Sequence, residues 1–412
     1  MTGETAGVNR PLRIAYLSGP AEAVRFLREM RDGTSDYFGT NYMKLFLRLA
    51  EDIGAEVQVV TWHDGEAYDT RIGRFRFINR PMRAAAGLRY QLFMLFWHLP
   101  VLARFLAFRP DVVVVTGNQD FWWTLAPLRL TGARLVASYH NMLWVRFSRR
   151  KAQSRLYAWL NARLVLRAMP AVITASSAIR EQVERLVGTG PGAPHILEQL
   201  PSYRREQFDT IPPPRPTPGT PFETIFLGRV EANKGVFDVL EVAERLERER
   251  PGEFRFHVCG DGTQLPELRA RIEAAGLGGT VLCHGYCRPE QVQAVMGRSH
   301  ASIVPTRSEC EAGFEMTCAE AVLSGRPLVS TAVCPALHYL GPAAMEVAPD
   351  DVDGYVQAIR SLKDDPALFR RLQAACGGLK DQFFDERNGW SFAMREALAL
   401  AVPGRLVREG EA

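Results

Sequence analysis

Short apolar segments alternate with longer amphipathic segments along most of the chain. Runs such as 111–117 (DVVVVTG) and 133–140 (ARLVASYH) are rich in β-branched residues, which is typical of parallel strands buried on both faces. The stretch 40–54 has the period of an amphipathic helix and ends in glycine. The other strands predicted in this half are 12–19, 55–62 and 171–177. Alternating strands and helices predict an α/β fold with a doubly wound parallel sheet.

A proline-rich segment divides this pattern into two halves. Nine of the 26 prolines lie between 191 and 221, which predicts an extended, semi-rigid linker. After it, the predicted strands are 223–229, 254–260, 280–286, 301–306 and 327–331, and the predicted helices are 235–249, 265–275, 289–298 and 314–325. We expect two Rossmann-like domains facing across a cleft. Their expected boundaries are 1–207, a linker over 208–221, 222–384, and a terminal helix and tail over 385–412.

Composition narrows the class of protein. The chain has 412 residues, of which 47% are hydrophobic and 23% charged, as in soluble multidomain proteins. Low-complexity disorder, collagen and a multispanning membrane protein are excluded. The seven cysteines are too few for a disulfide scaffold, and the closest pair, Cys283 and Cys287, has no second pair at zinc-site spacing. We therefore expect reduced, mostly buried thiols in a cytosolic chain. The first 30 residues lack the apolar run of a signal peptide.

Charge is distributed unevenly along the chain. Residues 1–210 hold 28 Lys and Arg against 18 Asp and Glu, whereas residues 211–412 hold 22 against 28. Within 70–180 the only acids are Asp111 and Asp120, against 18 basic residues. A basic, aromatic surface favours anionic lipid headgroups, but the same pattern fits a solvated helix face. No nucleic-acid-binding motif accompanies the charge, so we expect no nucleic-acid partner.

The most apolar segment of this basic region is Tyr90–Ala103. It has 14 residues, contains Pro100 and is flanked by Arg89 and Arg104. A bilayer requires about 20 apolar residues, so we do not expect this segment to span a membrane.

Two segments of the second half carry cationic or glycine-rich patterns. Arg229 ends a predicted strand, and Lys234 lies at the start of the next helix. Two cations beside free helix N–H groups form a site for a diphosphate, although an ordinary basic loop has the same pattern. The turn Gly260-Asp261-Gly262 follows another strand. It lacks the third glycine of a dinucleotide fingerprint and also fits a plain strand-to-helix turn.

Acidic residues gather in the segment 305–331. Glu320 lies beside an apolar run of its predicted helix, so we expect a half-buried carboxylate that needs a partner. A ribose diol is such a partner, because an ionised carboxylate accepts hydrogen bonds from two hydroxyls.

These segments, in this order, resemble the donor domain of retaining glycosyltransferases of family 4, which have the GT-B fold. The resemblance covers 222–400 well, and 12–190 more loosely through SYHNMLW (138–144) and AVITASSAIR (171–180). The motifs that carry it are GR-x4-KG at 228–235, GDG at 260–262, HGY at 284–286 and GF-x5-EA-x3-GRP at 313–327.

The resemblance implies roles for individual residues. Arg229 and Lys234 would bind the donor diphosphate and neutralise charge on the leaving group. Glu320 would hold the donor ribose. His140 would lie near the transferred sugar, although a histidine at a strand end is often structural. The other positions implied in the donor site are Gly39, Gly260, Gly285, Tyr286, Gly313, Phe314, Met316 and Thr317.

Two positions depart from the family pattern. The first glutamate of the family's Glu-x7-Glu motif, which contacts the donor hexose, would fall at 312, where this chain has Ala312. Glu315 stands where the family commonly has a small residue or asparagine. Either the adjacent Glu311 substitutes through a shifted loop, or the sugar is held differently, or catalysis is impaired.

The resemblance implies transfer of a hexosyl unit, with retention, from a UDP- or GDP-linked sugar to an acceptor glycan or lipid-linked saccharide. Neither a cofactor nor a metal is implied, and we expect Asp351 and Asp353, which resemble a metal motif of another transferase fold, to be structural. No carboxylate of the first half stands out as a nucleophile, in agreement with front-side displacement. The segment 385–402 would return to the first domain.

The expected setting is polysaccharide, exopolysaccharide or glycolipid synthesis in the cytoplasm, with peripheral contact at the inner face of the membrane. Two other functions remain open. One is a nucleotide-sugar isomerase with the GT-B fold. The other is a non-catalytic homologue that binds nucleotide or scaffolds a glycan assembly.

Overall fold

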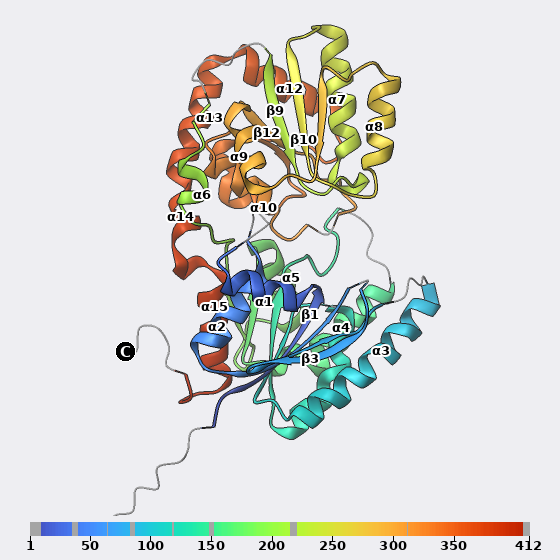
Figure 1. Cartoon of the computed structure of the whole chain (residues 1–412), viewed down its shortest axis with the longest axis vertical. Helices are drawn as coiled ribbons and strands as arrows, with labels where there is room; N and C mark the ends of the chain where they lie inside the picture. The colour runs from blue at the N-terminus through green and yellow to red at the C-terminus, as the bar shows by residue number, and fades with distance from the viewer. Residues whose placement is uncertain are drawn as a thin grey trace, which may run out of the picture.

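Two α/β domains, each built on its own sheet, make up the protein (Figure 1). The computed structural model describes residues 10–34, 40–63, 65–82, 87–117, 119–147, 152–214, 221–310 and 312–406. The red helices at the end of the chain run from the second domain back along the first (Figure 1).

The first domain has an eight-stranded sheet of order β3-β4-β2-β1-β5-β6-β7-β8, in which only the β3–β4 pair is antiparallel. Its strands are β1 (Arg13–Pro20), β2 (Glu56–Trp62), β3 (Tyr68–Ile72), β4 (Phe75–Asn79), β5 (Val112–Val115), β6 (Arg134–Tyr139), β7 (Ala171–Thr174) and β8 (His195–Glu198). Its helices are α1 (Ala23–Arg31), α2 (Tyr42–Asp52), α3 (Gly87–Phe108), α4 (Ala152–Leu164) and α5 (Ser177–Val187), with the 3₁₀ segments η1 (Gln119–Thr131) and η2 (Leu166–Ala168).

The second domain has a six-stranded parallel sheet of order β11-β10-β9-β12-β13-β14. Its strands are β9 (Phe222–Leu227), β10 (Phe254–Cys259), β11 (Val281–Gly285), β12 (Ala301–Val304), β13 (Leu328–Thr331) and β14 (Ala344–Val347). Its helices are α7 (Val236–Glu249), α8 (Leu265–Ala274), α9 (Pro289–Arg298), α10 (Met316–Leu323), α11 (Leu337–Leu340), α12 (Val352–Asp364), α13 (Pro366–Leu379) and α14 (Asp381–Phe384). The shorter segments are α6 (Glu206–Asp209) in the linker, η3 (Ala232–Lys234), η4 (Gly341–Ala343) and η5 (Glu386–Asn388).

The doubly wound parallel architecture is confirmed, and every predicted strand is present. The hairpin β3–β4 and the edge strands β8 and β14 were not predicted. β3 has the sequence YDTRI with an exposed middle, because it is an edge strand with no sheet partner on its outer side. Such a strand lacks the continuous apolar run that marks a buried parallel strand.

The last helix, α15 (Trp390–Ala401), packs into the core of the first domain. Trp390 is fully buried, and its indole Nε1 donates a hydrogen bond to Ser138 Oγ at 2.9 Å. The Leu200 amide also donates to the Asn388 carbonyl at 2.8 Å. The end of the chain therefore ties the second domain to the first.

The apolar segment 90–103 belongs to α3, a continuous helix of 22 residues that includes Pro100. The helix is therefore longer than the 14-residue segment that the sequence suggested, and among the described helices it is the one with the length and composition to cross a membrane. The expectation that it does not span stays a prediction. One face of α3, with Met94, Trp97, Val101 and Phe105, is buried in the first domain. Only 28% of its most apolar stretch is buried, which is less than in the core helix of a soluble protein, where most of the helix is buried.

Candidate functional site

The glycine-rich segments of the second domain meet at the carboxyl ends of β9, β10 and β11. Gly260 has φ 152°, and a Cβ atom there would lie 1.8 Å from the Gly228 carbonyl oxygen. The Gly260 amide donates a hydrogen bond to the Gly285 carbonyl at 2.8 Å. Only glycine fits this close approach of backbones. The structure therefore brings together Gly228, Gly260 and Gly285, the glycines of three predicted segments.

Lys234 lies beside this edge and forms an ion pair with Glu315. The Lys234 Nζ and Glu315 Oε1 atoms are 2.7 Å apart, and the side chains are only 16% and 12% exposed. Burial lowers the pKa of Lys234, but the nearby Glu315 carboxylate and Cys310 together more than offset this, so the net effect raises that pKa. Lys234 is therefore a fixed positive charge whose partner in the free protein is a carboxylate.

Arg229 lies on the same loop, and its side chain is exposed. Its positive charge is close enough to act on Lys234, where it lowers the pKa. Among the described residues, none forms a hydrogen bond or an ion pair with the Arg229 side chain, so its guanidinium is available to an anion. The structure thus brings the two predicted cations near each other, one buried and paired, the other open.

Helix α10 begins at Met316, two residues later than predicted, because Glu315 precedes it in a left-handed conformation with φ 63°. Phe314 is buried among the residues around α10. The Thr317 hydroxyl, in the first turn, is buried with no partner among the described residues. Such a group needs a partner, and the first turn of a helix favours anions.

His140 of the first domain reaches the same place from the other side. A Cβ atom on Gly313 would lie 1.7 Å from the His140 carbonyl oxygen, so the two backbones are in close contact. Ser176 Oγ of the first domain also donates a hydrogen bond to the Gly313 carbonyl at 2.8 Å. The end of β6 and the start of α10 therefore form one site across the domain interface.

The His140 ring is neutral at physiological pH, because burial lowers its pKa to about 4. Its Nε2 lies 3.2 Å from Ser138 Oγ, the atom that accepts the Trp390 hydrogen bond. This arrangement favours Ser138 as donor to Nε2 and leaves the ring proton on Nδ1. Nδ1 is buried and has no partner among the described residues, so it is an unused donor.

Glu320 is 3% exposed, so its carboxylate is fully rather than half buried. Burial raises its pKa to about 7, while a hydrogen bond from Tyr203 partly counteracts this. The Tyr203 hydroxyl donates to Glu320 Oε1 at 3.1 Å. Tyr203 lies between the two domains, and this contact could not be predicted from sequence because it joins residues 117 positions apart.

The raised pKa of Glu320 predicts a pH-dependent stability. Below about pH 4.5 the carboxyl is protonated in both states, and above about pH 7 the folded protein must hold a buried charge. Compared with Glu320→Gln, the native protein should therefore lose about 3 kcal/mol of unfolding free energy as pH rises through this range. Urea unfolding at pH 5 and pH 8 measures the difference. The exposed Glu346→Gln is the control, and equal pH slopes in all three proteins would contradict the prediction.

Other predicted residues lie away from these contacts or outside the description. Gly39 and Glu311 are outside the described residues. Ala312 is buried, and Tyr286 is exposed beside Gly285. Asp351 accepts a hydrogen bond from the Gly354 amide at the start of α12, and Asp353 pairs with Arg245. All seven cysteines are free, and five are buried. The described residues contain no cluster of His, Cys, Asp and Glu arranged for a metal ion.

Two family models match the two domains. The model "Glycosyl transferases group 1" matches residues 207–401, and the model "Glycosyltransferase Family 4" matches residues 40–197. The chain belongs to the family 4 glycosyltransferases. The resemblance found in the sequence is thereby confirmed, and the motifs at 228–235 and 313–327 lie within the matched region.

Curated relatives of this glycosyltransferase carry the names of different enzymes. The chain is 26% identical over 322 residues to a glycogen synthase of Mycobacterium tuberculosis, which covers 75% of this chain and 74% of the relative. It is 32% identical over 248 residues to a 2-deoxystreptamine N-acetyl-D-glucosaminyltransferase of Streptomyces fradiae, with 55% of each chain covered.

Solved structures confirm the GT-B fold. Sucrose-phosphate synthase of Thermosynechococcus elongatus has a TM-score of 0.66 and 15% identity, covering 94% of this chain and 98% of that one. Anabaena Alr3699/HepE in complex with UDP and glucose has a TM-score of 0.62 and 14% identity, covering 95% and 100%. At this level of identity the likeness concerns the fold alone.

Proposed function

We propose that this glycosyltransferase moves a hexosyl unit, with retention and without a metal, from a nucleoside-diphosphate sugar to an acceptor hydroxyl. One observation carries the proposal. Lys234 pairs with Glu315 at the start of α10, and Gly313 just before that helix lies against the His140 backbone of the other domain. His140 Nδ1 and Thr317 Oγ1 there are buried polar atoms without partners among the described residues. A diphosphate with its attached sugar supplies negative charge for Arg229 and Lys234 and hydrogen-bond partners for these two atoms. UDP with glucose in the structurally similar HepE supports a uridine donor.

The residues of the site have two roles: some bind the donor, and some also stabilise the negative charge of the leaving diphosphate. Lys234, Arg229 and the N–H groups of α10 bind the diphosphate and neutralise the charge that develops as the sugar leaves. This positive charge does the work that a metal ion does in other transferases. Glu320 accepts hydrogen bonds from the ribose, and His140 Nδ1–H donates to the hexose.

Retention follows from front-side attack. The acceptor oxygen bonds to the anomeric carbon on the face from which the diphosphate leaves, and a phosphate oxygen takes the acceptor proton. A double displacement instead requires a carboxylate nucleophile close to the sugar. At the contact between β6 and α10, the first domain contributes the neutral His140 ring and the Ser176 hydroxyl.

The acceptor that we propose is a glycan or a lipid-linked saccharide, in polysaccharide or glycolipid synthesis. The glycogen synthase among the relatives and the putative colanic acid glycosyltransferase of Escherichia coli, 29% identical over 123 residues, support this class. The seven free cysteines are compatible with the reducing cytoplasm that we propose as its location.

Thermal-shift screening of UDP, GDP and their sugars, followed by NMR of the product, tests this function. We expect one diphosphate to stabilise the protein and the product to keep the donor's anomeric configuration in the presence of EDTA. Stabilisation without transfer to any acceptor means a non-catalytic homologue. Donor conversion without an acceptor means an isomerase. An inverted product or a loss of activity in EDTA contradicts the mechanism.

A further inference from the structure

Exposed large hydrophobic side chains are concentrated in one part of the first domain. Of the ten such residues among those described, nine lie between positions 88 and 164, and the tenth is Tyr286. Leu88 is 75% exposed, Phe96 65% and Trp159 58%. Soluble proteins rarely gather apolar side chains on one surface unless that surface binds something.

Four of these residues form a stripe on α3. Leu88, Leu92, Phe96 and Leu99 follow one another at helical spacing, on the side opposite the buried Trp97 and Val101. Helix α3 runs along the outer edge of the first domain (Figure 1), and the four side chains of the stripe are 49–75% exposed. The stripe is therefore an apolar face presented to the surroundings.

Helix α4 also carries exposed apolar side chains close to α3. The Tyr157 hydroxyl of α4 donates a hydrogen bond to Gln91 Oε1 of α3 at 2.7 Å, so α4 approaches the amino-terminal part of α3. Leu156 and Trp159 of α4 are also exposed. An exposed tryptophan beside leucines is typical of surfaces that insert into the headgroup region of a bilayer.

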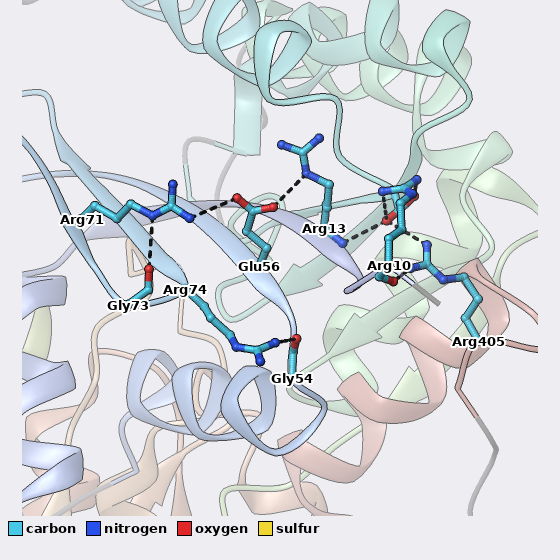
Figure 2. Close-up of polar contacts among 9 residues, drawn as sticks. Arg10, Arg13, Gly54, Glu56, Arg71, Gly73, Arg74 and Arg405 are labelled. Atoms are coloured by element: carbon cyan, nitrogen blue, oxygen red, sulfur yellow. Dashed lines mark hydrogen bonds and ion pairs between the residues drawn. The ribbon is translucent and has the colours of Figure 1, made fainter. Parts of the chain in front are cut away.

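A cavity rich in arginine lies at the other end of α3. It has a volume of about 780 Å³ and is lined by Leu106 of α3 and by Arg10, Arg109, Arg134 and Arg405, with Asp111 as its acid. The Asp111 carboxylate already has partners: it pairs with Arg10 at 2.6 Å and with Arg405 at 2.9 Å, and accepts a hydrogen bond from the Arg13 amide at 2.9 Å. Figure 2 shows Arg10, Arg13 and Arg405 close together at this end of the domain.

Two of the arginines in this cavity are uncommitted. Arg109 and Arg134 are exposed and have no ion-pair partner among the described residues. The cavity lies at the amino ends of β1, β5 and β6, whereas the donor site lies at carboxyl ends of strands. Its positive charge is therefore not part of the donor site, and a phosphate group is its natural ligand.

We propose that α3, α4 and this arginine-lined cavity form a membrane-docking surface for a bilayer that contains anionic phospholipid. The apolar stripe enters the interface, and Arg109 and Arg134 bind lipid phosphates. Helix α3 lies in the plane of the membrane and does not cross it, since Trp97, Val101 and Phe105 belong to the core of the first domain and crossing would expose that core. The proposal stands apart from the donor site, because docking requires no sugar nucleotide.

Vesicle sedimentation of the full chain tests the proposal directly. Vesicles of phosphatidylcholine with phosphatidylglycerol should bind the protein at least about tenfold more tightly than pure phosphatidylcholine, and high salt should release it. Release by salt distinguishes docking from spanning, because a helix that crosses the bilayer stays in the membrane until detergent is added.

Two double variants separate the apolar and the charged contributions. Arg109→Gln with Arg134→Gln should weaken binding to anionic vesicles roughly 10- to 30-fold, because each basic residue near such a surface contributes about a factor of five. Leu92→Ser with Phe96→Ser should weaken it by about tenfold or more. Both pairs are exposed, so their melting temperatures should stay at the wild-type value.

The matched control is Arg370→Gln with Arg371→Gln, two exposed arginines on α13 of the other domain that have no ion-pair partner in the described part of the chain. This control should bind vesicles as the wild type does. Equal affinity of all variants, equal binding to neutral vesicles, or retention in the membrane at high salt overturns the proposal. UDP binding, measured on the same samples, should be the same in the wild type, in both double variants and in the control, whether or not the proposal holds.

Discussion

Replacing Lys234 by alanine should abolish the thermal stabilisation by nucleoside diphosphate and reduce the transfer rate by about 10²- to 10³-fold. The loss is large because the Lys234 ammonium is a preorganised charge, held in a mostly buried position where water screens it little. Removing one such donor from a site of developing negative charge costs this much in other enzymes. Calorimetric titration with UDP and GDP and a single-turnover assay measure the two effects.

The same substitution leaves the Glu315 carboxylate buried without its partner, which destabilises the fold by itself. The double variant Lys234→Ala with Glu315→Gln removes both charges and should recover stability without recovering nucleotide binding. Lys363→Ala is the matched control, because Lys363 is 12% exposed and pairs with Glu253 at 2.8 Å on the far side of the same domain. Nucleotide binding by the double variant at wild-type affinity would remove Lys234 from the donor site.

The regular core of both domains was predictable from sequence, whereas its edges were not. Two strands of the first sheet, Val112–Val115 and Ala171–Thr174, are buried on both faces. Their continuous apolar sequences therefore predict buried strands. β3 pairs on one side only, and its sequence is as polar as that of a loop. The true length of α3 was missed because its ends were judged by their arginines and by Pro100, while packing of Trp97 and Phe105 against the domain core stabilises the full helix.

In the candidate site, too, sequence predicted the local motifs but not the contacts between them. Local motifs led to the prediction that Arg229, Lys234 and Glu320 belong to the donor site, since each motif is contiguous in sequence. The partners of these residues come from distant positions: Glu315 is 81 residues from Lys234, and Tyr203 is 117 residues from Glu320. Periodicity and spacing describe neighbours along the chain, so such contacts become visible only when the sheets bring their carboxyl ends together.

Glu315→Gln should tighten the binding of nucleoside diphosphate by about tenfold. In the free protein the Glu315 carboxylate holds Lys234 and stands at the start of α10, the position that favours an anion. It thus occupies the place that the proposed function gives to a phosphate. An incoming diphosphate must displace it or tolerate a negative charge beside its own, and at about 4 Å such repulsion reaches about 4 kcal/mol in a partly screened site.

The backbone at Glu315 supports this interpretation. Its φ of 63° lies in the left-handed region, which costs a residue with a side chain about 1 kcal/mol or more and persists where surrounding contacts enforce it. The ion pair with Lys234 is such a contact. Glutamine keeps the size of the side chain and can still accept a hydrogen bond from Lys234, so the variant changes mainly the charge.

Isothermal titration with the nucleotide chosen by the thermal screen measures the effect, with Glu253→Gln as the control that removes a carboxylate from the other lysine pair. Tighter binding by Glu315→Gln alone means that the native carboxylate competes with phosphate for Lys234. Weaker binding by the same variant means the reverse, that Glu315 holds Lys234 in its binding position. The charge on Lys234 is present in the wild type and in Glu315→Gln, so the sign of the change in nucleotide affinity distinguishes competition from positioning. Only competition agrees with an anion site that the Glu315 carboxylate occupies in the free protein.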